Sequence, residues 1–128
     1  TTWGFVMAHA KHNLLLGCRG EELAAQYFEN LGAEIVGRNV RYHCGELDVV
    51  ARFPDGEVVF VEVKTRSSLD YGGAEAVTPE KLTKLRRAAA MWLQGKPYMP
   101  VRFDVLVVLM NGDDVNYEHY EGVTDGAW

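Results

Sequence analysis

Apolar residues recur at helical spacing in two segments of the chain. Over residues 19–31 they form one stripe, which indicates an amphipathic helix and consists of Leu23, Ala24, Tyr27, Phe28 and Leu31. The second segment begins at Thr78-Pro79, where Thr is a favourable N-cap and Pro suits the first turn. Its apolar positions are Leu82, Leu85, Ala89 and Trp92, before the stop signals Gly95 and Pro97. The pattern therefore predicts two helices.

Five runs rich in Val and aromatic residues predict strands, over residues 34–42, 45–53, 57–64, 101–110 and 115–120. Pro54-Asp55-Gly56 is a turn signal, so the second and third strands should form an antiparallel hairpin. A helix between the third and fourth strands implies a parallel pair, and the fifth reads as an edge strand. The expected order is α-β-β-β-α-β-β in an α/β fold, with residues 1–14 as an N-terminal extension and 15–128 as one domain.

Charged side chains interrupt the two strands of this hairpin: Glu46 and Asp48 in one, Glu62 and Lys64 in the other. Charged residues rarely lie inside strands that belong to a core. If the hairpin turns about Asp55, Asp48 lies opposite Glu62 and Glu46 opposite Lys64, with Cβ atoms about 4.5–5.5 Å apart. The sequence thus predicts two carboxylates and an ammonium group gathered on one face.

Two carboxylates at that distance repel, and Mg²⁺ or Mn²⁺ reverses the effect because hard cations bind clustered carboxylate oxygens. The carbonyl oxygen of Val63 is a further candidate ligand. Lys64 suits the orientation of a water molecule or the stabilisation of charge at phosphorus, and a metal-bound water is a nucleophile near neutral pH. These residues predict phosphodiester hydrolysis. The structural alternative is a salt bridge from Lys64 to Asp48 or Glu46.

The net charge and its distribution along the chain bear on whether the protein binds nucleic acid. A net charge of −5 argues against a general nucleic-acid binder, although residues 112–128 hold five acids and no Lys or Arg. The remainder balances 13 acidic with 13 basic residues. Lys81, Lys84 and Arg87 share one side of the second helix, where they either contact phosphates or are simply solvated, and Arg66 begins a loop that could close on DNA.

No apolar run reaches the length of about 18 residues that a membrane span needs. Cys18 and Cys44 show no disulfide or metal-site spacing, so we expect a reduced, cytoplasmic protein without a membrane partner. The four histidines show no metal-ligand spacing, and Asp104 is expected to pair with Arg102 or a sheet neighbour.

Several longer motifs carry a resemblance to a known family: Gly20-Glu21, Gly45-Glu46-Leu47-Asp48, the run from Phe60 to Arg66, and Arg102-Phe103-Asp104. The chain resembles the bacterial YraN-like family, which is similar to archaeal Holliday-junction resolvases within the restriction-endonuclease-like, PD-(D/E)xK nuclease superfamily. The resemblance covers about residues 15–128. It implies a three-layer α/β/α fold with a mixed central sheet and a DNA endonuclease acting on branched or recombination DNA.

The resemblance also implies roles for individual residues. Asp48 and Glu62 match the metal ligands, Lys64 the catalytic lysine, and Glu21 the helix residue that completes the acidic cluster; Glu46 matches a family position of less defined role. Glu21 lies at the border of the first helix's apolar stripe, whereas Glu22 faces away from it. Resolvase-like relatives act as dimers, so a homodimer is implied as well. The alternative is a catalytically inactive nucleic-acid-binding or adaptor module, and a third is an interaction domain without nucleic-acid affinity.

Overall fold

A computed structural model describes residues 19–67 and 78–123. In this part of the chain, five strands form one mixed sheet in the order β1-β2-β3-β4-β5. Their bounds are β1 Glu34–Tyr42, β2 Gly45–Arg52, β3 Val58–Ser67, β4 Val101–Asn111 and β5 Asp114–Tyr120. The pair β3–β4 is parallel and the other neighbouring pairs are antiparallel, as the crossover and turn signals predict. The protein therefore has an α/β fold.

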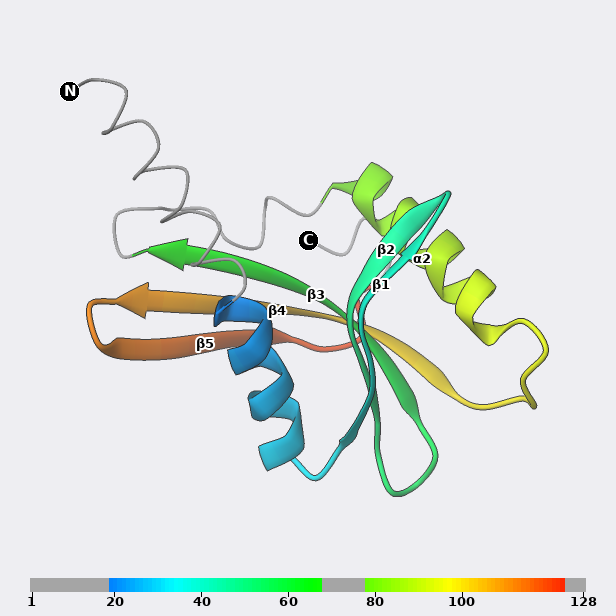
Figure 1. The fold of residues 1–128 in the computed structure, drawn as a ribbon, viewed down its shortest axis with the longest axis horizontal. Coiled ribbons are helices and arrows are strands. Elements are labelled where there is room, and N and C mark those ends of the chain that lie inside the picture. Colours follow the sequence, from blue (N-terminus) through cyan, green and yellow to red (C-terminus); the bar gives the residue numbers. More distant parts are fainter. Residues whose placement is uncertain (1–18, 68–77, 124–128) are drawn as a thin grey trace.

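Two helices lie on opposite faces of this sheet (Figure 1). The first is helical over residues 19–30, and α2 spans Pro79–Leu93 between β3 and β4. Thr78 is the N-cap of α2, since its Oγ1 accepts a hydrogen bond from the Lys81 N–H at 3.2 Å, and Pro79 follows it. Neither described helix has the length and apolarity that crossing a membrane requires.

Alternating residues of the strands divide the core into two clusters. Phe60 and Val105 pack against Leu82 and Leu85 of α2, whereas Val61 and Leu106 pack against Phe28 of the first helix. The apolar stripe that the sequence indicates packs against the sheet in both helices, with Leu23, Tyr27 and Trp92 half-buried and Leu31 as the exception. Leu31 is 50% exposed because the first helix ends at residue 30, before the stripe would return to the core.

Some predictions concern residues outside the described ranges. The N-terminal extension and Cys18 lie there, while Cys44 is a half-buried free thiol. The third strand is longer than predicted, because it pairs with β4 as far as Ser67. The extension includes Arg66, and Glu62, Lys64 and Arg66 all lie beyond Val61, where pairing with β2 ends.

Candidate functional site

The site lies where β2 leaves β3. The two strands pair from Arg52↔Val58 to Val49↔Val61, in the register expected for a turn about Asp55. The ladder ends there, so the predicted opposition of Asp48 with Glu62, and of Glu46 with Lys64, does not form. Beyond Val61 the described ladder of β3 involves β4 alone. Figure 1 shows the β1–β2 hairpin turning away from the remaining strands.

A local bend in the hairpin explains this separation. Leu47 belongs to the core cluster beneath α2 and Val49 to the opposite cluster, although residues two apart in a regular strand share a face. The β1 residue across from Asp48, between the pairs Arg38↔Val49 and Val40↔Leu47, is Asn39. Its φ of 49° is left-handed, a conformation that Asn tolerates better than most residues. The regular alternation of faces along β2 is therefore interrupted between Leu47 and Val49, next to Asp48.

The Asp48 side chain connects β2 to β3 beyond the last backbone pair of these two strands. Its Oδ2 accepts a hydrogen bond of 2.9 Å from the backbone N–H of Val63, just beyond the last β2–β3 pair. The carboxylate is 7% exposed. The Asp48 carboxylate oxygen thus replaces the backbone carbonyl that a paired strand would offer. The partly buried Val63 N–H group therefore keeps a hydrogen-bond partner.

Three other carboxylates, those of Glu62, Glu21 and Glu46, lie within electrostatic range of Asp48. Burial, followed by Glu62, raises the pKa of Asp48 to about 7; Glu21 and Glu46 also raise this pKa, whereas the Val63 hydrogen bond lowers it. Because the first helix, β2 and β3 contribute these acids, the fold gathers side chains from three elements. Glu21 is half-buried and Glu22 exposed, as the helical wheel predicts.

Two glycines allow these elements to approach closely. A Cβ atom on Gly20 would lie 2.0 Å from the Thr65 Oγ1, so the start of the first helix rests directly against β3. A Cβ on Gly45 would lie 2.7 Å from the backbone oxygen of Lys84, so the start of β2 rests against α2. Each glycine immediately precedes a glutamate of the acidic group. The Gly-Glu motifs therefore position carboxylates through backbone contact.

Cationic groups adjoin the acids. The Lys64 Nζ lies 3.1 Å from the Glu62 Oε1, and both side chains are largely buried. The predicted salt-bridge alternatives are not formed, since Lys64 pairs with Glu62 and Glu46 pairs with the exposed Arg41 at 3.4 Å. The Lys81 side chain also lies within electrostatic range of Lys64 and Glu62. The neighbouring Lys64 ammonium group, followed by burial, lowers the pKa of Lys81.

The donor set fits a hard divalent cation in its chemistry, because it offers several carboxylates whose mutual repulsion an ion would relieve. Ligand geometry is not preformed, however. In residues 19–67 and 78–123, no three acidic, His or Cys side chains converge closely enough to hold a metal. Of the predicted ligands, Glu21, Asp48 and Glu62 share one cluster, and Val63 adjoins it through its N–H group.

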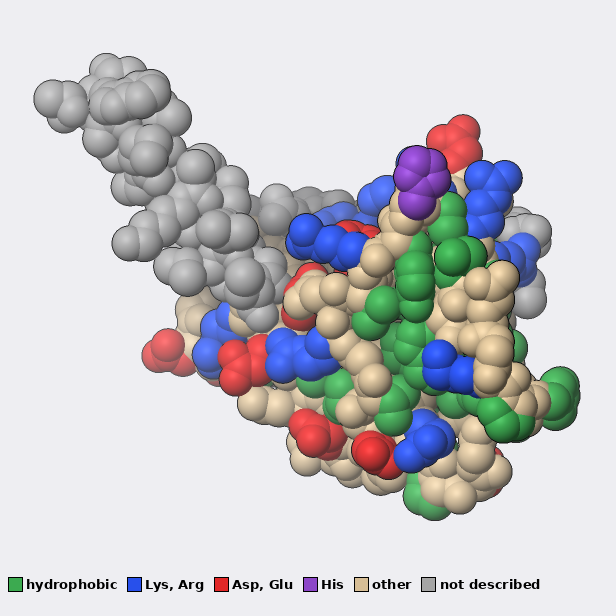
Figure 2. Space-filling view, turned by 45° about the vertical axis from the view of Figure 1, so that its right-hand side comes forward, with side chains coloured by type: hydrophobic (Ala, Val, Ile, Leu, Met, Phe, Trp, Pro, Cys, Tyr) green, Lys and Arg blue, Asp and Glu red, His purple; other side chains and the backbone are tan. Residues whose placement is uncertain are grey.

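The predicted DNA-binding residues fall into two groups. Lys81 reaches the site, and Arg66 lies in β3 with its guanidinium donating to the Thr65 carbonyl oxygen at 3.0 Å. Lys84 and Arg87 lie on the exposed side of α2, farther along the helix. Figure 2 shows one face of the molecule, on which Lys and Arg side chains alternate with acidic ones. Positive charge on this face is therefore divided among small groups of side chains and does not form one continuous patch.

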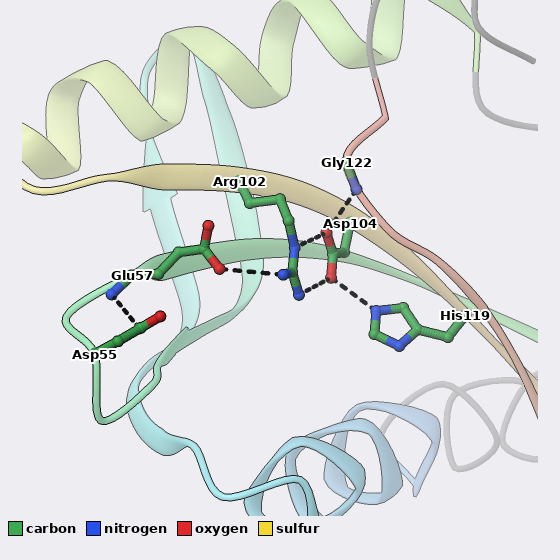
Figure 3. Close-up of polar contacts among 6 residues, drawn as sticks. All are labelled: Asp55, Glu57, Arg102, Asp104, His119 and Gly122. Carbon is green, nitrogen blue, oxygen red and sulfur yellow. Dashed lines mark hydrogen bonds and ion pairs between the residues drawn. The ribbon is translucent and has the colours of Figure 1, made fainter.

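A second polar cluster lies away from the acids, between β4, β5 and the first helix (Figure 3). The Arg102 guanidinium makes two hydrogen bonds of 2.9 Å to the fully buried Asp104 carboxylate, as the sequence led us to expect. His119 Nε2 lies 2.7 Å from the same carboxylate, and Tyr27 reaches the His119 ring at 3.1 Å. Sequence reasoning gave His119 no role, because only the β4–β5 pairing brings it to Asp104.

Comparison with known proteins places the chain in a family. The model of the uncharacterised protein family UPF0102 matches residues 20–108, which include every element of the site. A UPF0102 protein of Corynebacterium diphtheriae is 49% identical over 92% of this chain and 98% of its own length. One from Geobacter sulfurreducens is 47% identical over 91% of this chain and 94% of its own length. The chain therefore belongs to the UPF0102 family.

Proposed function

We propose that this protein is a metal-dependent DNA endonuclease with a restriction-endonuclease-like fold. The observation that carries the proposal is the convergence of Asp48, Glu62 and Lys64 at the point where β2 leaves β3. Clustered acids beside a buried lysine suit phosphodiester hydrolysis, because the reaction develops negative charge that cations must stabilise. A mixed sheet with one helix on each face is compatible with that fold.

In this proposal the acids hold the metal and the lysine acts on the substrate. Glu21, Asp48 and Glu62 would bind Mg²⁺ or Mn²⁺, with the Val63 carbonyl as a further oxygen ligand and Glu46 in a supporting position. The ion, when bound, supplies an activated water and charge neutralisation. Lys64 then donates a hydrogen bond to the attacking water or to a non-bridging phosphate oxygen, and it must exchange Glu62 for that partner.

Positive side chains around the acids would bind the DNA backbone. Arg66 of β3 and Lys81 of α2 lie beside the cluster, and Lys84 and Arg87 lie farther along α2. Contacts to phosphates are the main source of affinity for DNA. The substrate class follows from the resemblance to resolvase-like nucleases, so we propose branched or recombination DNA. A homodimer would allow two strands to be cut symmetrically.

A second candidate is a nucleic-acid-binding or adaptor module without catalytic activity. The Glu62–Lys64 ion pair favours it, since that pair neutralises a proposed metal ligand inside the protein. The absence of three convergent ligands in the described residues favours it as well. The two candidates differ in one measurable property, which is affinity for a divalent cation at Asp48.

Calorimetric titration with Mn²⁺ tests the proposal without requiring the right substrate. The parent should bind Mn²⁺, and Asp48→Asn should weaken binding by at least about tenfold, because it removes the central charged ligand. Asp114→Asn, an exposed acid of β5, is the matched control and should bind as the parent does. Equal Mn²⁺ affinity in the parent and Asp48→Asn would contradict the metal site.

Nicking of DNA with Mn²⁺ or Mg²⁺ then tests catalysis. Asp48→Ala and Lys64→Ala should reduce the cleavage rate by about a hundredfold or more, as expected for groups that stabilise transition-state charge. Lys96→Ala, near the far end of α2, should cleave at the parent rate. Activity that survives both site substitutions would identify a contaminating nuclease and would leave the binding-module candidate standing.

A further inference from the structure

Three cations occupy the side of the acidic cluster that faces α2. Lys64 and Arg66 alternate with Thr65 along β3 and therefore share the face of Phe60, which packs against α2. Lys81 lies in the first turn of α2, within electrostatic range of Lys64, Arg66 and Glu62. The site thus has an acidic half and a cationic half.

Backbone contacts fix the position of Lys81. Its N–H group donates to the N-cap Thr78, which places Lys81 at the third helical position. One turn later, the Lys84 backbone oxygen rests against Gly45, where a Cβ would approach to 2.7 Å. The beginning of α2 is therefore docked on the beginning of β2, and the Lys81 side chain extends from a rigid support rather than from a loop.

The described groups of the cationic half carry more positive than negative charge, which favours binding of an anion. Glu62 neutralises one of the two adjacent ammonium groups, and its carboxylate lies 3.1 Å from Lys64. Lys81 and Arg66 add two more positive charges near Lys64, and Glu80 in the first turn of α2 adds one negative charge, so these described groups keep an excess of positive charge. Adjacent ammonium groups repel, and a phosphate group relieves that repulsion because it presents several oxygens to several donors.

We propose that Lys64, Lys81 and Arg66 form a phosphate-binding cradle, in which Lys81 is a further catalytic residue that contacts the reacting phosphate. The Lys81 ammonium donates a hydrogen bond to a non-bridging oxygen and forms or breaks no covalent bond. Lys84 and Arg87, which lie farther from Lys64 along α2, contact more distant phosphates and contribute to affinity alone. The catalytic part rests on the proposed nuclease function, whereas binding of a phosphate anion does not.

Inorganic phosphate probes the cradle without any cleavage. When phosphate replaces chloride at constant ionic strength, the thermal midpoint of the parent should rise by about 2–4 °C, because a ligand of the folded state stabilises it. Lys81→Gln should lose at least half of this rise. Lys84→Gln removes the same charge one turn away and should keep it. Equal phosphate shifts in the parent and Lys81→Gln would overturn the cradle.

Single-turnover cleavage with Mn²⁺ then separates catalysis from affinity. At saturating DNA, Lys81→Gln should slow cleavage by about a hundredfold while the dissociation constant for DNA changes less than about threefold. Lys96→Gln, just beyond the far end of α2, is the control and should keep both the parent affinity and the parent rate. Lys81→Arg, which keeps the charge, should recover at least part of the rate. A Lys81→Gln variant that binds DNA weakly yet cleaves at the parent rate would overturn the catalytic role.

These results distinguish this inference from the proposed function. If the parent binds phosphate through Lys81 but neither binds Mn²⁺ nor cleaves DNA, the nuclease proposal and the catalytic role of Lys81 both fail and the anion cradle remains. If the parent cleaves and Lys81→Gln keeps both the phosphate shift and the rate, the cradle fails and the nuclease remains. Lys81 is exposed in the first turn of α2, so its replacement leaves the buried core intact.

Discussion

At the scale of single residues, Asp48 combines burial with the proximity of three other carboxylates. Its pKa rises to about 7 through burial and then Glu62, whereas the unfolded chain restores the ordinary pKa of 3.8. The folded state therefore holds this proton more tightly than the unfolded state does. In the absence of metal, the free energy of unfolding should fall as the pH rises from about 4 to about 7, because the buried group must then ionise.

Replacement of Asp48 by Asn should remove this dependence. Near pH 8, Asp48→Asn should be more stable than the parent by on the order of 3 kcal/mol, because a neutral amide replaces a buried charge and still accepts the Val63 hydrogen bond. Near pH 4, where the parent carboxyl is protonated, the two proteins should differ by less than about 1 kcal/mol. Urea unfolding in the presence of a chelator measures both values. A variant less stable than the parent at both pH values would contradict the shifted pKa.

Arg102 provides a second prediction at this scale, because its partner Asp104 is fully buried. Burial raises the pKa of Asp104, but hydrogen bonds from His119 and Arg102 outweigh burial and lower it overall. Arg102→Met removes two of those hydrogen bonds and should cost about 3 kcal/mol of stability in urea unfolding near pH 7.

The matched control is Arg52→Met. Arg52 makes an ion pair of 2.8 Å with Glu34, but both side chains are more than half exposed, so the loss should be within about 0.5 kcal/mol. Equal losses at the two arginines would mean that the cluster around Asp104 adds nothing beyond a surface ion pair.

At the scale of elements, the first helix is positioned by its contact with β3. Gly20 has no room for a side chain because of Thr65, so Gly20→Ala should push the helix outward and carry Glu21 away from Asp48. Overpacking of this kind costs about 1–3 kcal/mol. Thr65→Ala removes the nearest obstructing atom, Oγ1 at 2.0 Å, together with Cγ2, and the Thr65 Cβ that remains would lie 3.1 Å away.

A double-mutant cycle therefore tests this contact. Gly20→Ala/Thr65→Ala should regain at least half of the stability that Gly20→Ala loses, measured by urea unfolding, because coupled residues are not additive. The double variant should also regain Mn²⁺ affinity if Glu21 is a ligand. Strict additivity of the two substitutions would show that the helix is held by other contacts.

The elements themselves follow from local sequence, whereas the site does not. Thr78 as a cap, the turn at Asp55 and the alternation in β3 are each signalled within a few residues, and each is confirmed. The bend at Asp48 depends on the left-handed Asn39 in the neighbouring strand, which no alternation pattern reveals. For the same reason, Lys81 beside Lys64 and His119 beside Asp104 required knowledge of which elements pack together.

At the scale of the whole molecule, stability and metal binding should depend on each other through protons. If Mn²⁺ binds at Asp48 as proposed, it competes with the proton of that carboxyl, so binding should release a proton below about pH 7 and tighten as the pH rises. Saturating Mn²⁺ should raise the thermal midpoint more near pH 8 than near pH 6, since binding to the folded state alone stabilises it. Asp48→Asn should reduce the rise at both pH values. An equal rise in parent and variant would place the ion elsewhere.

The early end of the β2–β3 ladder has a consequence for how this chain can evolve. A regular residue in place of Asn39 would let the hairpin lie flat, and strand pairing would then extend toward Glu62 and Lys64. Such a sheet would gain hydrogen bonds and close the opening in which the carboxylates meet. The early end of the ladder therefore gives up strand pairing in exchange for the space in which Asp48 lies near Glu62.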